Sequence, residues 1–281
     1  MLSRIADSLF WIARYMERAE DMARMLDVQY YVLLQGAQRP EARPEAVFDF
    51  LANSIVQCIA QARANARAIR DRITREMWED LNGLYLELSR LRMDEVRAAG
   101  PHHFCNLVQF GSYRFQGVSD ATLPHDEGWQ FLQAGRALER TDMTARILEG
   151  PPGPDDAQNQ HWMAVLKSVA AYDVYRRRYT SRIDPEKVVE LLVLDPRHPR
   201  SIRFNIAALE AALRAIGGAA PEAYANEAER LAGRLNDTLK YDRIADIFGR
   251  GLHAFLADVR HTCCAIGDEV ARTYFCYAVA S

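Results

Sequence analysis

Two segments of this chain, beginning at Ala13 and Gly135, repeat one pattern of charged and apolar residues. Arg14 and Arg136 stand 122 positions apart, and further residue types recur at the same spacing. The other matched pairs are Glu17 and Glu139, Arg18 and Arg140, Ala23 and Ala145, Arg24 and Arg146, and Leu26 and Leu148. An internal repeat of this length indicates a duplicated helical unit. We therefore predict two halves, residues 1–120 and 121–281, within one helical domain over residues 1–281.

A second similarity between the two halves of the sequence supports the duplication. Residues 188–192 followed by Ser201-Ile202 resemble residues 47–51 followed by Ser54-Ile55. The later copy carries residues 193–200 where the earlier one has only Ala52-Asn53. Either the first half lost this loop, or residues of the first half are missing from this sequence. Because a lone half would leave an apolar face exposed, we expect a single large helical bundle with an approximate internal twofold.

Apolar residues recur at three- and four-residue spacing through most of the chain, and the prolines fall between these stretches. This spacing predicts helices, and no stretch shows the period-two alternation that is typical of strands. The expected helices are 3–34, 45–71, 74–98, 102–118, 126–149, 160–180, 185–194, 200–216, 222–240 and 242–278. The predicted fold class is all-α.

The composition, 49% hydrophobic and 26% charged, is typical of a folded globular protein rather than a disordered one. A net charge of −3 gives no basic excess of the kind that favours nucleic acid. No apolar run reaches the length of a membrane span, and Arg4 and Asp7 argue against a signal peptide. The five cysteines show no C-x-x-C spacing, so we expect reduced, mostly buried thiols. These features predict a cytoplasmic protein with no nucleic-acid or membrane partner.

The repeated Arg and Glu residues are the leading candidates for a functional site. Bulky residues lie off the main apolar stripe of the first repeat, which indicates a helix buried on several faces. In one interpretation, Glu17–Arg18 and Glu139–Arg140 are internal ion pairs that orient the two halves. In the other, the arginines line a shared cavity and bind an anionic ligand or acidic peptide with bidentate geometry. The candidate residues are Arg14, Glu17, Arg18, Arg24, Arg136, Glu139, Arg140 and Arg146.

Four further residues are candidates for contact with the same ligand. Glu127 stands in the first turn of a predicted helix, where an acid either favours the helix dipole or faces the arginine cavity. Arg176, Arg177 and Arg203 are either solvated or inter-helix charges, or they grip an anion such as a phosphate.

Arg67 and Arg70 present the same alternatives, and in the structural one they pair with Glu76 and Glu79 across a tight helix connection. No metal site is predicted, because no glutamate is followed by a histidine three positions later. The chain also has no serine or cysteine nucleophile signature and no phosphate-binding loop. We therefore predict neither a metal nor a cofactor.

Several longer stretches resemble a known family. They are residues 2–20, 76–79, 126–129, 135–146, 175–179, 194–204 and 251–256. Together they resemble the bacterial alpha-E domain family, all-helical proteins named for their helical content and a Glu-Arg motif. The first half lacks the extended Asp-Pro-type loop that this resemblance leads us to expect before Ser54.

The resemblance implies an association with circularly permuted ATP-grasp proteins, often near transglutaminase-like proteases and sometimes near a proteasome-like peptidase. Such a context implies a system that forms or edits peptide-type amide bonds. The expectation is a non-catalytic accessory subunit that partners an ATP-grasp-type ligase and binds an acidic or anionic ligand between Arg and Glu residues.

The alternative is an enzyme that acts on an aminoacyl or acidic substrate, with Glu17 or Glu139 as acid or base. A glutamate beside two arginines is favoured in its ionised form, which suits a general base poorly. The sequence therefore favours binding over catalysis, and it leaves a homodimer open.

Overall fold

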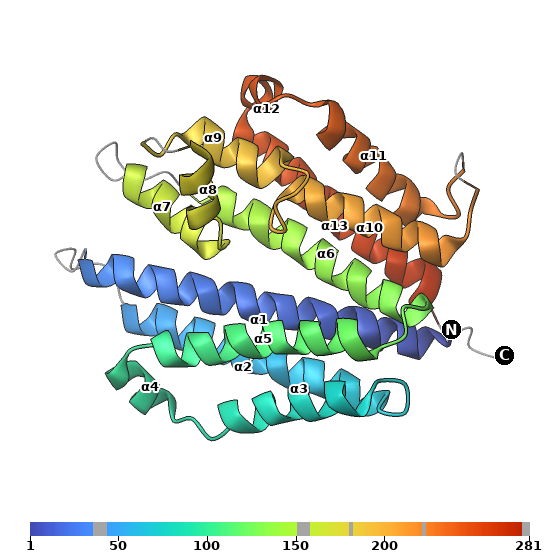
Figure 1. The fold of residues 1–281 in the computed structure, drawn as a ribbon, viewed down its shortest axis with the longest axis horizontal. Coiled ribbons are helices and arrows are strands. Elements are labelled where there is room, and N and C mark those ends of the chain that lie inside the picture. Colours follow the sequence, from blue (N-terminus) through green and yellow to red (C-terminus); the bar gives the residue numbers. More distant parts are fainter. Residues whose placement is uncertain (36–43, 151–157, 180–181, 221–222, 277–281) are drawn as a thin grey trace. The chain divides into compact units, whose positions relative to one another are not determined.

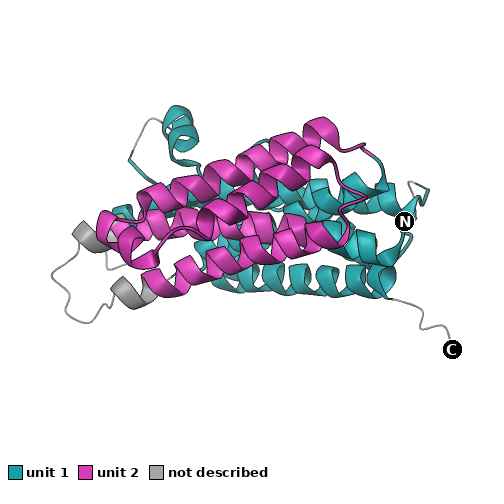
Figure 2. Ribbon diagram, turned by 90° about the horizontal axis from the view of Figure 1, so that it is seen from below, with its two compact units in different colours: residues 1–10, 126–281 teal, residues 11–125 magenta. Residues whose placement is uncertain are grey.

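The computed structural model describes residues 1–35, 44–150, 158–179, 182–220 and 223–276, and every regular element within these ranges is helical (Figure 1). The all-α prediction is confirmed for this part of the chain. Within it, no helix combines the length and the hydropathy needed to cross a membrane. The chain separates into two compact units, residues 1–10 with 126–281, and residues 11–125 (Figure 2). The internal twofold and the halves at 1–120 and 121–281 stay predictions.

The unit formed by residues 11–125 is a set of packed helices. It contains α1 (Ser3–Gln35) from Trp11 onward, α2 (Pro44–Ala68), α3 (Arg75–Leu88), α4 (Met93–Ala99) and α5 (His102–Thr122). Helix α3 packs against both α2 and α5. Ile59 of α2, Leu84 of α3 and Phe104 of α5 are fully buried in its core. Each such side chain contributes roughly 1.5–3 kcal/mol by leaving water, so the apolar stripes hold this unit together.

The second unit combines the start of α1 with the rest of the chain. Its elements are α6 (Glu127–Leu148), α7 (Gln158–Ser168), α8 (Tyr172–Tyr179), α9 (Pro185–Val189), the π-helical η2 (Glu190–Leu194), α10 (Ile202–Gly217), α11 (Glu227–Tyr241), α12 (Ile244–Arg250), α13 (Leu252–Val270) and the π-helical η3 (Ala271–Phe275). Helix α6 packs along α10 and α13, and α11 packs against the same two helices (Figure 1). Leu138, Ile206 and Leu256 lie in this core.

Three helices that were predicted to be continuous are broken. Residues 74–98 form α3, which ends at Leu88 with Ser89 as its C-cap, and α4, which begins at Met93. Residues 160–180 form α7 and α8, and Ala170 between them has a φ of +52°. Residues 242–278 form α12, α13 and η3, because Gly251 takes a φ of +90°, which glycine adopts without steric cost.

One predicted helix start is also wrong. Helix α11 begins at Glu227 rather than at residue 222, because the Asn226 side chain accepts a 3.1 Å hydrogen bond from the Glu229 N–H. Three of the five cysteines are buried, in line with the expectation of mostly buried thiols. The exposed ones are Cys264 and Cys276.

Candidate functional site

The first Arg/Glu cluster lies on α1, within the unit formed by residues 11–125. Glu17 is buried, and its Oε1 accepts a 2.6 Å hydrogen bond from Gln116 Nε2 of α5. The Arg14 guanidinium lies 4.7 Å from the centre of the Trp11 ring, and Arg18 is half-buried. Glu17 is therefore a hydrogen-bond acceptor that holds α1 against α5.

One turn beyond Glu17, Glu20 and Arg24 form an ion pair with 2.7 Å between Oε1 and Nη2. The Glu20 side chain is fully buried, and 11% of the Arg24 side chain is exposed. The Tyr113 hydroxyl of α5 accepts a further hydrogen bond from Arg24. Since a buried carboxylate is costly without a cation, Arg24 stabilises the packing of α1 on α5.

The second Arg/Glu cluster lies on α6, in the unit formed by residues 1–10 and 126–281. Glu139 is fully buried and Arg140 is half-buried. Arg136 is half-buried and donates a hydrogen bond to Gln133 Oε1. As on α1, the glutamate of the Glu-Arg motif lies away from solvent.

Asp142 and Arg146 repeat the Glu20–Arg24 pair at the matched positions of the second copy. Arg146 Nε lies 2.7 Å from Asp142 Oδ2, again at i to i+4 spacing. Arg260 of α13 adds a contact, with 3.7 Å between its Nε and Asp142 Oδ1. The Arg146 side chain is 48% exposed, so water reaches this pair more readily than the first. Both copies therefore carry an acid–arginine pair one turn beyond the Glu-Arg motif.

Because the two clusters belong to different units, the shared cavity stays a prediction. Glu127 lies in the first turn of α6, next to the capping residue Asp126. Its carboxylate lies 2.9 Å from the Met1 amino group. Arg176 and Arg177 are exposed on α8.

Of the alternatives for Arg67 and Arg70, pairing with Glu76 and Glu79 is not seen among the described residues, whereas the Arg70 guanidinium lies 5.1 Å from the centre of the Trp78 ring. Glu79 instead pairs with Arg75 of its own helix, with 2.6 Å between Oε1 and Nε. A partner four residues away on one helix is nearer than a partner across a connection.

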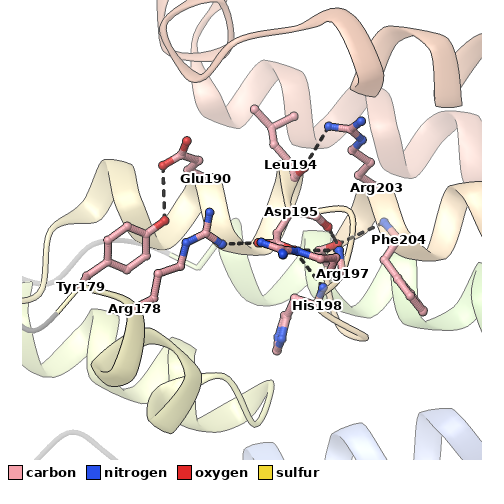
Figure 3. A network of polar contacts seen from close by, with 10 residues as sticks. Arg178, Tyr179, Glu190, Leu194, Asp195, Arg197, His198, Arg203 and Phe204 are labelled. Atoms are coloured by element: carbon pink, nitrogen blue, oxygen red, sulfur yellow. Dashed lines mark hydrogen bonds and ion pairs between the residues drawn. The ribbon is translucent and has the colours of Figure 1, made fainter.

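A turn between η2 and α10 gathers polar groups from several elements (Figure 3). Asp195 is only 7% exposed, and its Oδ1 accepts backbone N–H bonds from Arg197 at 2.7 Å and His198 at 2.9 Å. Its other carboxylate oxygen accepts a hydrogen bond from Arg178 of α8. The residues that we call the Asp195 turn are Arg178, Leu194, Asp195, Arg197, His198 and Arg203.

The hydrogen bonds keep Asp195 ionised. Burial alone would raise the pKa of Asp195, but bonds from the Arg197 N–H, the Arg178 guanidinium and the His198 N–H outweigh it, so the pKa lies below its ordinary value. The bond to Asp195 in turn raises the pKa of Arg178. The carboxylate is therefore a fixed negative charge that positions Arg178.

The Asp195 turn is joined to the helix of the second Glu-Arg motif. Thr144 Oγ1 of α6 donates to the Arg200 carbonyl at 3.1 Å, and Ser201 caps the N-terminus of α10. His198 is buried, and its Nε2 has no hydrogen-bond partner among the residues that the structure describes. Burial lowers the pKa of His198, while Asp195 raises it and Arg200 lowers it further.

Arginines outnumber carboxylates around this turn. Arg203 Nη1 donates to the Leu194 carbonyl at 3.3 Å, and Arg197 is exposed. Within the described ranges, neither arginine forms an ion pair, nor do Arg176 and Arg177. A guanidinium binds a carboxylate or phosphate through two parallel N–H···O bonds. The chemistry that this arrangement offers is anion binding.

The candidate list from the sequence contained Arg203 but not Arg178, Asp195 or His198. The sequence signal that could have identified Asp195 is the run Asp195-Pro196-Arg197-His198. An aspartate at the start of a turn often accepts a hydrogen bond from the backbone N–H two residues later. Periodicity does not show which arginine of α8 reaches that carboxylate.

In the described part of the chain, no three His, Cys, Asp or Glu side chains gather in a way that could hold a metal ion. A groove of about 760 Å³ follows α11 and α12, and none of the candidate residues lines it.

Comparison with known proteins matches residues 1–52 and 44–275 to the alpha-E family, described as a predicted alpha-helical domain with a conserved ER motif. Uncharacterized proteins of Mycobacterium bovis (strain ATCC BAA-935 / AF2122/97) and Mycobacterium tuberculosis (strain CDC 1551 / Oshkosh) are each 24% identical over 315 aligned residues. An uncharacterized protein of M. tuberculosis strain H37Rv is 23% identical over the same length. The matches cover 91% of this chain and 34% of each relative, so the chain spans about a third of the length of these curated relatives. No solved structure matches. The match covers nearly the whole chain and includes Glu17-Arg18 and Glu139-Arg140, and the chain therefore belongs to the alpha-E family.

Proposed function

We propose that this protein is an accessory, ligand-binding subunit of a system that forms or modifies peptide-type amide bonds. In this proposal it binds an acidic or anionic ligand and partners an ATP-grasp-type ligase in the cytoplasm. The observation that carries the ligand-binding part is the Asp195 turn, where the buried Asp195 carboxylate accepts a bond from Arg178, Arg203 bonds the Leu194 carbonyl, and the Arg197 side chain is exposed.

The charge balance of the Asp195 turn favours an anion. Asp195 neutralises one of the three arginines, and Arg197 extends into solvent. Arg176 and Arg177, exposed on α8, add two further cations without an acidic partner among the described residues. An acidic peptide or a phosphate would supply the missing negative charge with little desolvation of the exposed groups.

The Glu-Arg motifs support binding rather than catalysis. Glu17 is buried and its carboxylate already accepts a hydrogen bond from Gln116, so it is engaged in packing rather than open to a substrate proton. We assign Glu17 and Glu139 to holding their helices, and the arginines beside them to the predicted cavity. The matched Glu20–Arg24 and Asp142–Arg146 pairs support descent of the two halves from one duplicated unit.

The partnership with a ligase rests on the family resemblance and on the length of the relatives. Only 34% of each mycobacterial relative corresponds to this chain, so there the helical domain is joined to further sequence. We propose that such an attached or separately encoded partner supplies the ATP-dependent step.

Ligand binding is tested with fluorescein-labelled hexaglutamate and inorganic phosphate as probes. The variant Arg176→Gln/Arg177→Gln/Arg197→Gln removes three exposed cations, and Arg72→Gln/Arg75→Gln/Arg90→Gln is its charge-matched control. At about 0.5 kcal/mol for each exposed charge contact, the first variant should weaken hexaglutamate binding about tenfold. Equal binding by both variants, or no binding to the unaltered chain, would contradict the site.

The partnership is tested by co-purification with a circularly permuted ATP-grasp protein from the same organism, followed by ATP consumption with and without the subunit. The proposal expects a stable complex and a change in ATP consumption. Turnover of an aminoacyl substrate by the purified chain alone, lost in Glu17→Gln or Glu139→Gln, would establish the enzyme alternative instead.

A further inference from the structure

Three arginines lie at the end of α2 and in the turn that follows it. Arg63 and Arg67 belong to the last turns of α2, which ends at Ala68, and Arg70 stands in the turn before α3. At about 100° per residue, Arg67 is turned by about 40° from Arg63, so these two lie on one face of α2. Arg63 is half-buried, and the other two are exposed. This end of α2 therefore carries a short stripe of positive charge.

The neighbouring helix α3 places aromatic rings beside this stripe. The Arg63 guanidinium lies 4.5 Å from the centre of the Tyr85 ring and 5.7 Å from that of Trp78. Its Nε donates a 2.8 Å hydrogen bond to Asn82 Oδ1, and Arg70 stacks over Trp78 at 5.1 Å. Two arginines are thus held against rings by cation–π contacts, and the other donors of Arg63 stay available.

The carboxylates near this face lie in other ion pairs or on another side of α3. Among the described residues, no acidic side chain pairs with Arg63, Arg67 or Arg70. The nearby acids are engaged elsewhere or point elsewhere: Asp71 pairs with Arg72, Glu79 with Arg75 and Asp80 with Arg114. Glu76 and Glu87 lie about 160° and 180° around α3 from Trp78, on its opposite side. The face therefore combines three uncompensated cations with two aromatic rings.

We propose that this surface, the α2–α3 arginine face, docks an acidic helical segment of a protein partner. The residues of the face are Arg63, Arg67, Arg70, Trp78, Asn82 and Tyr85. Arg, Trp and Tyr are the residue types that dominate binding energy at protein interfaces. A partner helix with carboxylates at i, i+4 and i+7 presents three of them on one face, over roughly 10 Å, as partners for the three guanidinium groups.

The charge of the whole chain favours a protein segment over nucleic acid. A net charge of −3 repels a long polyanion, whereas a short acidic helix contacts only the local cations. The face lies in the unit formed by residues 11–125, and the Asp195 turn lies in the other, so the two binding proposals fail or succeed separately.

The test uses the full chain and a lactam-stapled, fluorescein-labelled helical peptide with glutamates at i, i+4 and i+7 and a leucine between them. Fluorescence anisotropy should show binding that Arg63→Gln/Arg67→Gln/Arg70→Gln weakens at least tenfold. Tyr85→Phe, which keeps the ring, should bind within twofold of the unaltered chain. Circular dichroism melts of each variant show whether a loss reflects unfolding.

Two controls separate this face from general electrostatics. Arg176→Gln/Arg177→Gln/Arg197→Gln makes the same change in net charge in the other unit and should bind the peptide normally. A peptide of equal charge with its glutamates on different helix faces should bind at least fivefold more weakly. Equal loss in the control variant, equal binding of the second peptide, tighter binding of a DNA duplex, or no binding at all would overturn the proposal.

Discussion

Replacing Gly135 by alanine tests whether the second Glu-Arg helix needs its glycine. A Cβ at Gly135 would lie 2.3 Å from the Phe10 carbonyl oxygen and 3.2 Å from Phe10 Cα, both backbone atoms. Since a backbone cannot rotate aside, α6 would have to move by about 1 Å from the start of α1 or strain locally, and such overpacking costs up to about 3 kcal/mol. Against this cost, alanine has a higher helix propensity than glycine, which stabilises α6 by about 1 kcal/mol. The expected net loss is about 2 kcal/mol of unfolding free energy.

Thermal melts followed by circular dichroism measure this loss. For a chain of this size about 2 kcal/mol corresponds to a fall in Tm of roughly 4–8 °C. Gly117→Ala on α5 is the matched control, because a Cβ there meets nothing within 4 Å, and its Tm should stay level or rise. If Gly135→Ala melts at or above the temperature of Gly117→Ala, the close approach of the two helices is not a constraint and the reasoning fails.

Three further predictions concern charge and thiols. In urea titrations, Arg24→Ala should lower the free energy of unfolding by about 3 kcal/mol and Arg146→Ala by no more than about 1 kcal/mol. The reason is that the Glu20–Arg24 pair is buried, whereas the Arg146 side chain of the other pair is about half exposed. Equal losses would contradict this reasoning. Burial lowers the pKa of His198, so as the pH falls the unfolded chain binds a proton at this histidine before the folded chain does. The folded state therefore loses stability as the pH falls below the ordinary pKa of 6.5. In melts between pH 5 and 7, His198→Gln should make Tm less dependent on pH, and an unchanged slope would refute this prediction. Iodoacetamide should label the exposed Cys264 rapidly and leave Cys105 unmodified, because Cys105 is buried and burial raises the pKa of its thiol. Labelling of Cys105 in the native state, detected by peptide mass spectrometry, would count against the structure.

The helices were predictable because their signals are local. Apolar spacing marked the buried stripes, and the prolines marked the connections, so the fold class followed from the sequence alone. The break at Ala170 was not predictable, because its neighbours Val169 and Ala171 are both fully buried and their packing, rather than a glycine, holds the φ of +52°. The left-handed backbone conformation of Ala170 depends on tertiary contacts, which the spacing of apolar residues in the sequence does not reveal.

The sequence predicted the burial of the motif glutamates, but it did not predict the Asp195 turn. Both motif glutamates are buried, as the bulky residues around them indicated. The Asp195 turn was missed because its members are dispersed between α8 and α10 and meet only through the fold. Of the three consecutive arginines on α8, only Arg178 bonds Asp195. That choice depends on the rotation of α8, which a run of identical residues does not reveal.

The two Glu-Arg helices differ at several matched positions, and these differences bear on how each contributes to binding. The small residue at the matched position is Ala13 in the first helix and Gly135 in the second, where an added Cβ would meet the Phe10 backbone. The acid one turn beyond the motif is a buried glutamate in the first copy, whereas in the second a shorter aspartate shares its charge with Arg146 and Arg260. Only the second copy is tied by Thr144 to the turn that carries the arginine excess. An anion bound at that turn would therefore perturb the second Glu-Arg helix directly, so substitutions in the two copies should have unequal effects on binding even though their sequences match.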